Sequence, residues 1–346
     1  MAQARTGILV TGGAGFIGSA FVRSALAHRP GARVVTLDAL TYAGSLENLR
    51  NLPDADRHTF VEGDVRDGAL VRELLDEHDV GLVAHFAAES HVDRSIAGPA
   101  AFVETNVLGT QALLDACRGA WAEGAGFADG VRFHHVSTDE VYGDLGPDDP
   151  AFTEQTPYAP SSPYSASKAG SDHLVRAYSR TYGLPVTITN CSNNYGPRQY
   201  PEKLIPVVIQ RALAGEPIPV YGDGGNVRDW LYVGDHCDAI WAVIERGEVG
   251  ETYNVGGNAE VDNLTLVRTL CAVLDRRRPD RAPHADLVTF VTDRPGHDRR
   301  YAVDTAKIER LGWAPRQSLQ SGLEATVDWY LGHQGWVEAV AEEAAR

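Results

Sequence analysis

A tyrosine and a lysine at helical spacing are the first candidates for chemistry in this chain. Residues 164–168 read YSASK, so the phenol of Tyr164 and the amine of Lys168 lie four residues apart and share one face of a predicted helix. A nearby ammonium lowers the pKa of a phenol and makes it a usable base near neutral pH. We therefore expect an alcohol-oxidising unit, in which Thr138 hydrogen-bonds the same substrate hydroxyl.

Two adjacent carboxylates add a second kind of chemistry. Residues 137–143 read STDEVYG and follow an apolar run that predicts a buried strand. A solvated polar turn is one interpretation of Asp139 and Glu140. In a shielded pocket, however, neighbouring carboxylates separate their pKa values, so that one stays protonated and the other ionised. Such a pair can take a proton from one carbon and protonate a leaving hydroxyl on the next, which a simple dehydrogenase does not need.

A glycine-rich turn predicts a dinucleotide site. Residues 11–18 read TGGAGFIG, follow the first predicted strand and open a helix. Glycines at 12, 15 and 18 let the backbone approach a pyrophosphate at the helix N-terminus, although a plain tight turn is the alternative. Asp38 ends the second predicted strand. Its carboxylate can accept from ribose hydroxyls and would repel a 2′-phosphate, so NAD is favoured over NADP unless Asp38 is only a surface turn residue.

These residues need a scaffold, and the first half of the chain predicts one. Apolar, strand-like runs alternate with helical patterns, which is typical of a parallel sheet covered on both faces. The predicted strands are 8–11, 33–37, 59–62, 80–86, 131–137 and 186–190, and the predicted helices include 16–28, 70–78 and 102–118. The prediction is an α/β fold with a doubly wound, Rossmann-type parallel sheet. Asp64, Val65, Ala87 and Ala88 follow the third and fourth strands at the carboxyl edge, where a cofactor should lie.

Proline and glycine become frequent after residue 190, which favours a smaller C-terminal α/β region that binds substrate. We expect residues 1–190 to form the NAD-binding domain, with 228–257 returning to it. Residues 191–227 and 258–346 are then expected to form the substrate-binding domain.

Composition limits the possible partners. The 346 residues carry a formal net charge of −16, which argues against nucleic-acid and anionic-membrane binding. No apolar run approaches membrane-spanning length, and the chain enters its first strand without a leader-like segment. Four widely spaced cysteines predict free thiols in a cytoplasmic protein and no metal site. The net charge does not exclude a small anionic ligand, because such a ligand needs only a local basic pocket. Arg228 and Arg294 are the best candidates for the cations of that pocket.

Together these motifs identify a resemblance. The chain resembles the nucleotide-sugar branch of the extended short-chain dehydrogenase/reductase family, and within it the sugar-nucleotide 4,6-dehydratases. The likeness covers nearly the whole length and is carried by residues 11–18, 85–93, 137–143, 164–168, 193–197, 203–206, 222–233 and 293–298. The Asp–Glu pair is the most discriminating part, because related 4-epimerases lack it.

The resemblance implies a reaction on dTDP-glucose. Tyr164, helped by Thr138 and Lys168, takes the proton of the 4-hydroxyl while hydride passes to NAD. Glu140 then removes the C5 proton, Asp139 protonates the departing 6-hydroxyl, and the hydride returns to C6. NAD is regenerated in each turnover and is expected to stay tightly bound.

The resemblance also implies two sets of binding residues. The cofactor set is Gly12, Gly15, Phe16, Ile17, Gly18, Asp38, Thr41, Asp64, Val65, Ala87, Ala88, Ser90, Asn106, Ser137, Tyr164, Lys168 and Asn194. The set expected to bind the nucleotide sugar is Ser90, His91, Thr138, Asn193, Asn194, Lys203, Leu204, Pro219, Tyr221, Arg228, Asn263, Arg294 and His297.

The helices predicted at 102–118 and 163–182 correspond to the dimer interface of that family, so a homodimer is expected. Two alternatives remain open at this point. One is a related CDP- or UDP-sugar enzyme, and the other is a non-catalytic NAD-binding sensor on the same fold. The intact Thr138, Tyr164 and Lys168 argue against the sensor.

Overall fold

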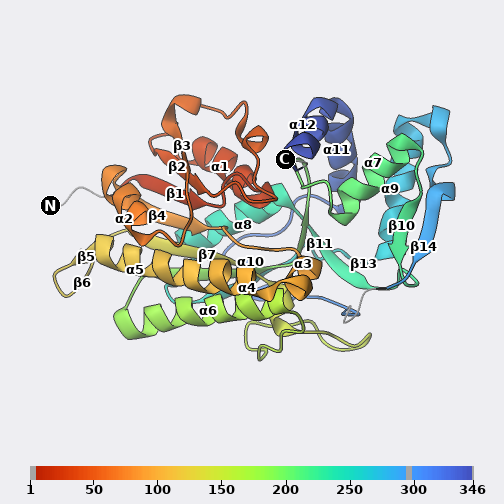
Figure 1. Ribbon diagram of the computed structural model, residues 1–346. Helices are drawn as coiled ribbons and strands as arrows, with labels where there is room; N and C mark the ends of the chain where they lie inside the picture. The colour runs from red at the N-terminus through yellow and green to blue at the C-terminus, as the bar shows by residue number, and fades with distance from the viewer. Residues whose placement is uncertain (1–4, 294–297, 345–346) are drawn as a thin grey trace.

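A seven-stranded, all-parallel sheet forms the centre of the protein. A computed structural model describes residues 5–293 and 298–344. The strand order is β12-β8-β7-β4-β1-β2-β3 (Figure 1). The strands are β1 (Gly7–Thr11), β2 (Val34–Asp38), β3 (His58–Glu62), β4 (Val80–His85), β7 (Arg132–Thr138), β8 (Val186–Cys191) and β12 (Thr252–Val255). All neighbours run parallel, as expected when every crossover returns over a face of the sheet.

Helices cover both faces of this sheet, and β1 shows why the chain requires it. Leu9 packs into a cluster with side chains of α2, α5 and α6, whereas Ile8 and Val10 pack into a cluster with α1 and α8. All three are buried, so neither face of the strand meets water. The helices are α1 (Phe16–His28), α2 (Gly68–Glu77), α5 (Thr110–Trp121), α6 (Pro163–Tyr182) and α8 (Val233–Arg246). The predicted doubly wound α/β fold is confirmed.

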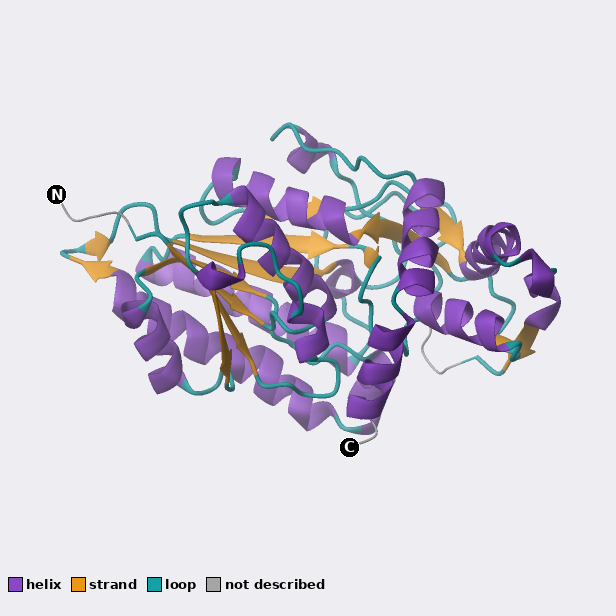
Figure 2. Cartoon of the chain, turned by 90° about the horizontal axis from the view of Figure 1, so that it is seen from above, coloured by secondary structure: helices purple, strands orange, loops and turns teal. Residues whose placement is uncertain are grey.

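A second region with its own apolar core lies beside the sheet (Figure 2). Its helices are α7 (Leu204–Ala214), α9 (Asn263–Arg277), α11 (Leu319–Gly332) and α12 (Gln334–Ala344), and its two-stranded sheet joins β10 (Ile218–Tyr221) to β14 (Val288–Val291). A further sheet has the order β13-β11-β9 and comprises β9 (Asn193–Tyr195), β11 (Val227–Tyr232) and β13 (Glu260–Asp262).

The segment 228–257 is therefore divided between two sheets. β12 joins the main sheet through β8, and α8 packs on α1 through the same apolar cluster. β11, in contrast, pairs with β9 and β13 and stands outside the main sheet.

The helix expected at 102–118 is present, but its winding changes along its length. α4 (Pro99–Phe102) leads into a π-helical segment, η3 (Val103–Gly109), before α5 begins. Two side chains of η3, Glu104 and Thr105, reach the large cleft described below. Wide turns of this kind often occur at functional sites.

The remaining elements are short and connect the main layers. They are α3 (Val92–Ala97), α10 (Ala306–Glu309), β5 (Ala122–Glu123), β6 (Gly126–Phe127), η1 (Leu46–Leu49), η2 (Ala55–Arg57), η4 (Asp139–Tyr142), η5 (Pro279–Arg281) and η6 (His284–Leu287).

The cysteines and the helices bear on the protein's environment. Cys117, Cys191, Cys237 and Cys271 are all buried, and none of them forms a disulfide. Within residues 5–293 and 298–344, no helix combines the length and the apolar character needed to cross a membrane.

Close packing between the glycine loop and α1 generates a first prediction. A Cβ at Gly18 would lie 2.1 Å from the carbonyl oxygen of Gly12, so Gly18→Ala must displace the loop. We expect this variant to lose about 1–3 kcal/mol of unfolding free energy, measured by denaturant titration. Gly31→Ala is the matched control, because a Cβ there meets nothing within 4 Å. Equal stability of the two variants would contradict the close approach.

Candidate active site

One large cleft opens at the carboxyl ends of the central strands, with a volume of about 500 Å³. It brings together most of the residues expected from the sequence. These are Gly12, Gly15, Phe16, Ile17, Gly18, Asp38, Thr41, Asp64, Val65, Ala87, Ala88, Ser90, Ser137, Thr138, Asp139, Glu140, Tyr164, Lys168, Asn193, Asn194 and Lys203. The described residues include no group of three or more His, Cys, Asp or Glu side chains that could hold a metal ion.

The backbone of the glycine loop can come close to a ligand. Gly12 has φ +70°, and a Cβ there would lie 2.6 Å from the backbone nitrogen of Ala87. α1 begins at Phe16 without a side-chain cap, so the N–H groups of its first turn stay available to an anion. The space beside Gly12 is free because glycine has no side chain, and the free N–H groups of α1 lie at the start of the following helix. This combination fits the pyrophosphate of a dinucleotide.

Asp38 fixes this loop from the next strand. Its Oδ2 accepts from the backbone nitrogen of Ala14 at 2.8 Å, and its Oδ1 accepts from that of Leu40 at 2.9 Å. Burial raises the pKa of Asp38, and these backbone hydrogen bonds oppose the rise. The carboxylate lines the cleft beside the loop, where ribose hydroxyls would meet it.

The carboxylate pair begins a short helix at the end of β7. Thr138 caps η4, and its hydroxyl accepts from the backbone nitrogen of Glu140 at 3.3 Å. The same hydroxyl donates to Oδ1 of Asp139 at 3.4 Å. These local hydrogen bonds fix the turn that carries Asp139 and Glu140. Both residues line the cleft.

Its surroundings shift Asp139 toward the protonated form. Its side chain is buried, and burial is the main cause that raises its pKa well above the usual range, followed by the charges of Glu140 and Asp229. The Arg228 guanidinium opposes this rise. Among the described residues, Oδ2 of Asp139 has no hydrogen-bond partner. A buried, protonated carboxyl with a free oxygen is equipped to donate a proton to a ligand.

Tyr164 enters the cleft from the first turn of α6. Ser162 begins that helix with a capping box, and Pro163 occupies its first turn. We expected Lys168 to lower the phenol pKa, but in this structure the pKa of Tyr164 is raised well above its ordinary value. Burial is the main cause and the charge of Glu140 the next, while a hydrogen bond with Thr138 opposes the rise.

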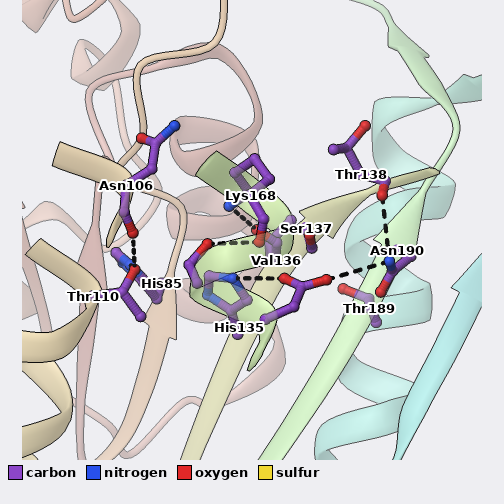
Figure 3. A network of polar contacts seen from close by, with 12 residues as sticks. His85, Asn106, Thr110, His135, Val136, Ser137, Thr138, Lys168, Thr189 and Asn190 are labelled. Atoms are coloured by element: carbon purple, nitrogen blue, oxygen red, sulfur yellow. Dashed lines mark hydrogen bonds and ion pairs between the residues drawn. The ribbon is translucent and has the colours of Figure 1, made fainter. Parts of the chain in front are cut away.

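Lys168 is buried one turn further along α6. Its Nζ donates to the carbonyl oxygen of Val136 at 2.9 Å, which ties the helix to β7 (Figure 3). Burial lowers the pKa of Lys168, and the Asp172 carboxylate opposes this effect. The ammonium is therefore held within the protein by a carbonyl and by a buried counter-charge.

Sequence reasoning missed the polar residues beneath the site. Nε2 of His135 lies 3.2 Å from Oδ1 of Asp172 (Figure 3). The Asn190 amide donates to the carbonyl oxygen of Thr138 at 3.3 Å and to Oδ2 of Asp172 at 3.4 Å. Burial lowers the pKa of His135 to about 4. The available signal was the position of Asp172, one helical turn beyond Lys168.

Several expected residues do not line the cleft. These are His91, Asn106, Leu204, Pro219, Tyr221, Arg228 and Asn263. Asn106 donates to Ser167 at 2.8 Å and pairs with the backbone of Glu89, so it holds the loop after β4 rather than facing the cleft. The Arg228 guanidinium donates to the carbonyl oxygens of Val227 and Asp298 and lies 4.3 Å from the Tyr301 ring centroid. The expected residues Arg294 and His297 lie outside the described residues.

Comparison with known proteins finds close relatives over nearly the whole chain. The sequence model of the GDP-mannose 4,6 dehydratase family matches residues 9–326. The chain is 60% identical over 342 residues to a dTDP-glucose 4,6-dehydratase of Xanthomonas campestris pv. campestris, which covers 98% of this chain and 97% of that protein.

Solved structures agree with this similarity. DesIV from Streptomyces venezuelae, a dTDP-glucose 4,6-dehydratase with NAD and TYD bound, superposes with a TM-score of 0.87 at 49% identity, over 97% of this chain and 100% of that one. A dTDP-glucose 4,6-dehydratase from Bacillus anthracis in complex with NAD gives 0.85 at 44% identity, over 97% and 99% of the two chains.

The buried Asp139 leads to a prediction about stability. Because its pKa is raised in the folded state, its contribution to stability is full below the ordinary carboxyl pKa of 3.8 and declines as the pH rises toward the folded pKa. Asp139→Asn lacks this penalty, so we expect it to melt a few degrees above the wild type at pH 8. The difference should shrink as the pH falls toward 4, and scanning calorimetry across this range would measure it.

Asp148→Asn is the control, because it makes the same change at an exposed carboxyl on a loop. A gain in melting temperature that does not depend on pH would contradict the protonated state of Asp139.

Proposed function

Because the chain belongs to the GDP-mannose 4,6 dehydratase family, we propose that it is an NAD-dependent lyase that removes water from dTDP-glucose. The product is dTDP-4-keto-6-deoxyglucose. The observation that carries the proposal is the buried Asp139, whose pKa is raised by burial, beside Glu140 in one cleft with Tyr164 and Lys168. A dehydrogenase or an epimerase has no use for such a donor, whereas loss of a hydroxyl as water requires one.

The cofactor is NAD, and the cleft fits it. The glycines at 12, 15 and 18 would receive the pyrophosphate, Asp38 the ribose, and Asp64 and Val65 the adenosine end. When bound, NAD supplies the acceptor for the C4 hydride and returns that hydride at C6. We propose that it stays bound between turnovers.

The chain's own residues move the protons. Tyr164 accepts the proton of the 4-hydroxyl, with Thr138 hydrogen-bonded to it and the buried Lys168 charge available to a phenolate. The resulting C4 ketone acidifies the hydrogen on C5, and Glu140 removes it. Asp139 gives its proton to the 6-hydroxyl, which leaves as water. Glu140 returns its proton to C5 as hydride adds at C6.

The substrate side of the cleft contains Asn193, Asn194 and Lys203. We propose that these hold the sugar and that the second region holds the nucleotide, through Leu204, Pro219, Tyr221, Arg228 and Asn263 together with Arg294 and His297. Ser90 and His91 belong to the sugar end. In this division, residues 1–190 with part of 228–257 bind NAD, and residues 191–227 and 258–346 bind the substrate.

The protein is further proposed to be a cytoplasmic homodimer. Its four buried free thiols suit a reducing compartment. Val103 and Leu108 on η3 are 50% and 52% exposed, next to α6, and Ile96 nearby is 52% exposed. Apolar side chains gathered on one face favour a partner surface, here a second copy of the chain.

Activity is tested by incubating the purified protein with dTDP-glucose and no added NAD. The expected product is lighter by one water, formed with the cofactor that the protein already carries. Asp139→Asn and Glu140→Gln should each lower the rate of water loss by about 10²–10⁴-fold while C4 oxidation continues, seen as reduced nicotinamide in a single turnover.

Tyr164→Phe is the matched control and should lose C4 oxidation itself. Elimination at the wild-type rate in both carboxylate variants would refute their roles. An unchanged dTDP-glucose mass after NAD is supplied, with conversion of CDP- or UDP-glucose instead, would replace the substrate assignment.

The dimer is tested by Leu108→Asp, which places a charge on the proposed interface. We expect it to sediment as a monomer in analytical ultracentrifugation, while the wild type sediments as a dimer. Phe290→Asp is the control, because Phe290 is 59% exposed on β14, which pairs with β10 in the second region. A monomeric wild type, or a dimeric Leu108→Asp, would refute the interface.

A further inference from the structure

A buried tryptophan near the C-terminus touches the cofactor-binding half of the protein. Trp336 on α12 is 9% exposed, and its indole Nε1 donates to Oδ1 of Asn48 at 3.0 Å. Asn48 belongs to η1, the short helix that follows β2 in the sequence. Its side chain is buried, at 3% exposed. This hydrogen bond therefore joins residues 288 positions apart in the sequence.

Asn48 also forms a hydrogen bond with the glycine loop. Its Nδ2 donates to the carbonyl oxygen of Ala14 at 2.8 Å, and the backbone nitrogen of Ser45 donates to the same oxygen at 3.1 Å. On its other side, Ala14 donates its own N–H to Asp38. Ala14 is thus held from both sides, once by the β2 carboxylate and once by the side chain that Trp336 orients.

The segment between Asp38 and Asn48 forms one wall of the cleft. Thr41, Tyr42, Ala43 and Gly44 all line it. This segment is held at one end by Asp38 and at the other by Ser45 and Asn48, and the ring of Tyr42 between them lies 5.7 Å from that of Tyr200. Detachment of this segment at Asn48 would loosen the wall that faces the glycine loop across the cleft.

We propose that Trp336 and Asn48 form a latch that closes the wall of residues 41–48 against the glycine loop and so slows the release of NAD. The inference deepens the proposed function and rests on it, since a cofactor regenerated in every turnover has to remain in place. Both are positioning residues, because neither lines the cleft.

The opposite wall is anchored from the neighbouring helix. The hydroxyl of Tyr330 on α11 donates to the carbonyl oxygen of Gln199, and the Gln199 amide donates to the carbonyl oxygen of Asn194 at 2.8 Å. The rings of Trp329 on α11 and Trp336 on α12 lie 5.0 Å apart in an edge-on contact. One helix pair thus holds a cofactor wall and a substrate wall, which makes the C-terminal helices part of the site's frame.

The latch is tested by Trp336→Phe, which keeps an aromatic ring in the core but removes the N–H donor. Its loss leaves Oδ1 of Asn48 buried without that partner, which favours opening of the wall. We expect NAD to dissociate from the holoenzyme about ten-fold faster than from the wild type. Stopped-flow dilution of the holoenzyme into an NAD-capturing dehydrogenase would measure the rate in the absence of sugar nucleotide.

Trp329→Phe is the matched control, since Trp329 packs on Trp336 but makes no recorded hydrogen bond to the wall among the described residues. If the role of Trp336 were only structural, Trp336→Phe and Trp329→Phe would speed NAD release equally and would lower the melting temperature alike. Equal NAD release from Trp336→Phe and the wild type, or equal acceleration by Trp329→Phe, would overturn the latch.

Asn48→Ala provides a second test from the other end of the same chain of hydrogen bonds. It should also speed NAD release, and the double variant should add little to either single change, because both act through one contact. Fully additive effects would overturn the latch. The outcome is separable from the proposed function: a wild type that holds NAD but does not dehydrate dTDP-glucose would refute the function and leave the release rates interpretable.

Discussion

A parallel sheet that is buried on both faces opens its cleft at the edge where its strands end. Backbone register aligns Thr11 with His85 and His85 with His135 across β1, β4 and β7. Side chains reinforce this alignment, because the His85 ring lies 2.7 Å from the Thr11 hydroxyl and 2.9 Å from that of Thr110. The glycine loop, the β4 loop and the carboxylate pair all depend on that shared edge.

Burial then decides what the gathered groups can do. It raises the pKa of Asp139 and Tyr164 and lowers that of Lys168, so each is pushed toward its neutral form. Opposite charges limit the effect at Lys168, where the Asp172 carboxylate lies beneath the site. The cleft thus favours the proton-donating form of Asp139, at a cost to folding stability that a water-exposed pair would not carry.

The second region supplies more than a substrate surface. Its two C-terminal helices hold opposite walls of the cleft, one through Asn48 and one through Gln199. In the proposed function, the cofactor wall and the sugar wall are therefore held by the same packed helix pair. This arrangement suits a reaction in which oxidation, elimination and reduction must follow one another without release of either partner.

The sequence alone determined the glycine loop, the Tyr164–Lys168 spacing and the acidic pair, because helix periodicity and strand ends are properties of short segments. It also predicted the doubly wound sheet and the family. Tertiary structure alone decided the raised pKa of Tyr164, since burial depends on which distant segments cover a side chain. It decided as well the place of Asn106 behind the cleft, and the contact from Trp336 to Asn48. No local pattern encodes a hydrogen bond between residues 288 positions apart, because only the packing of the two regions brings them together.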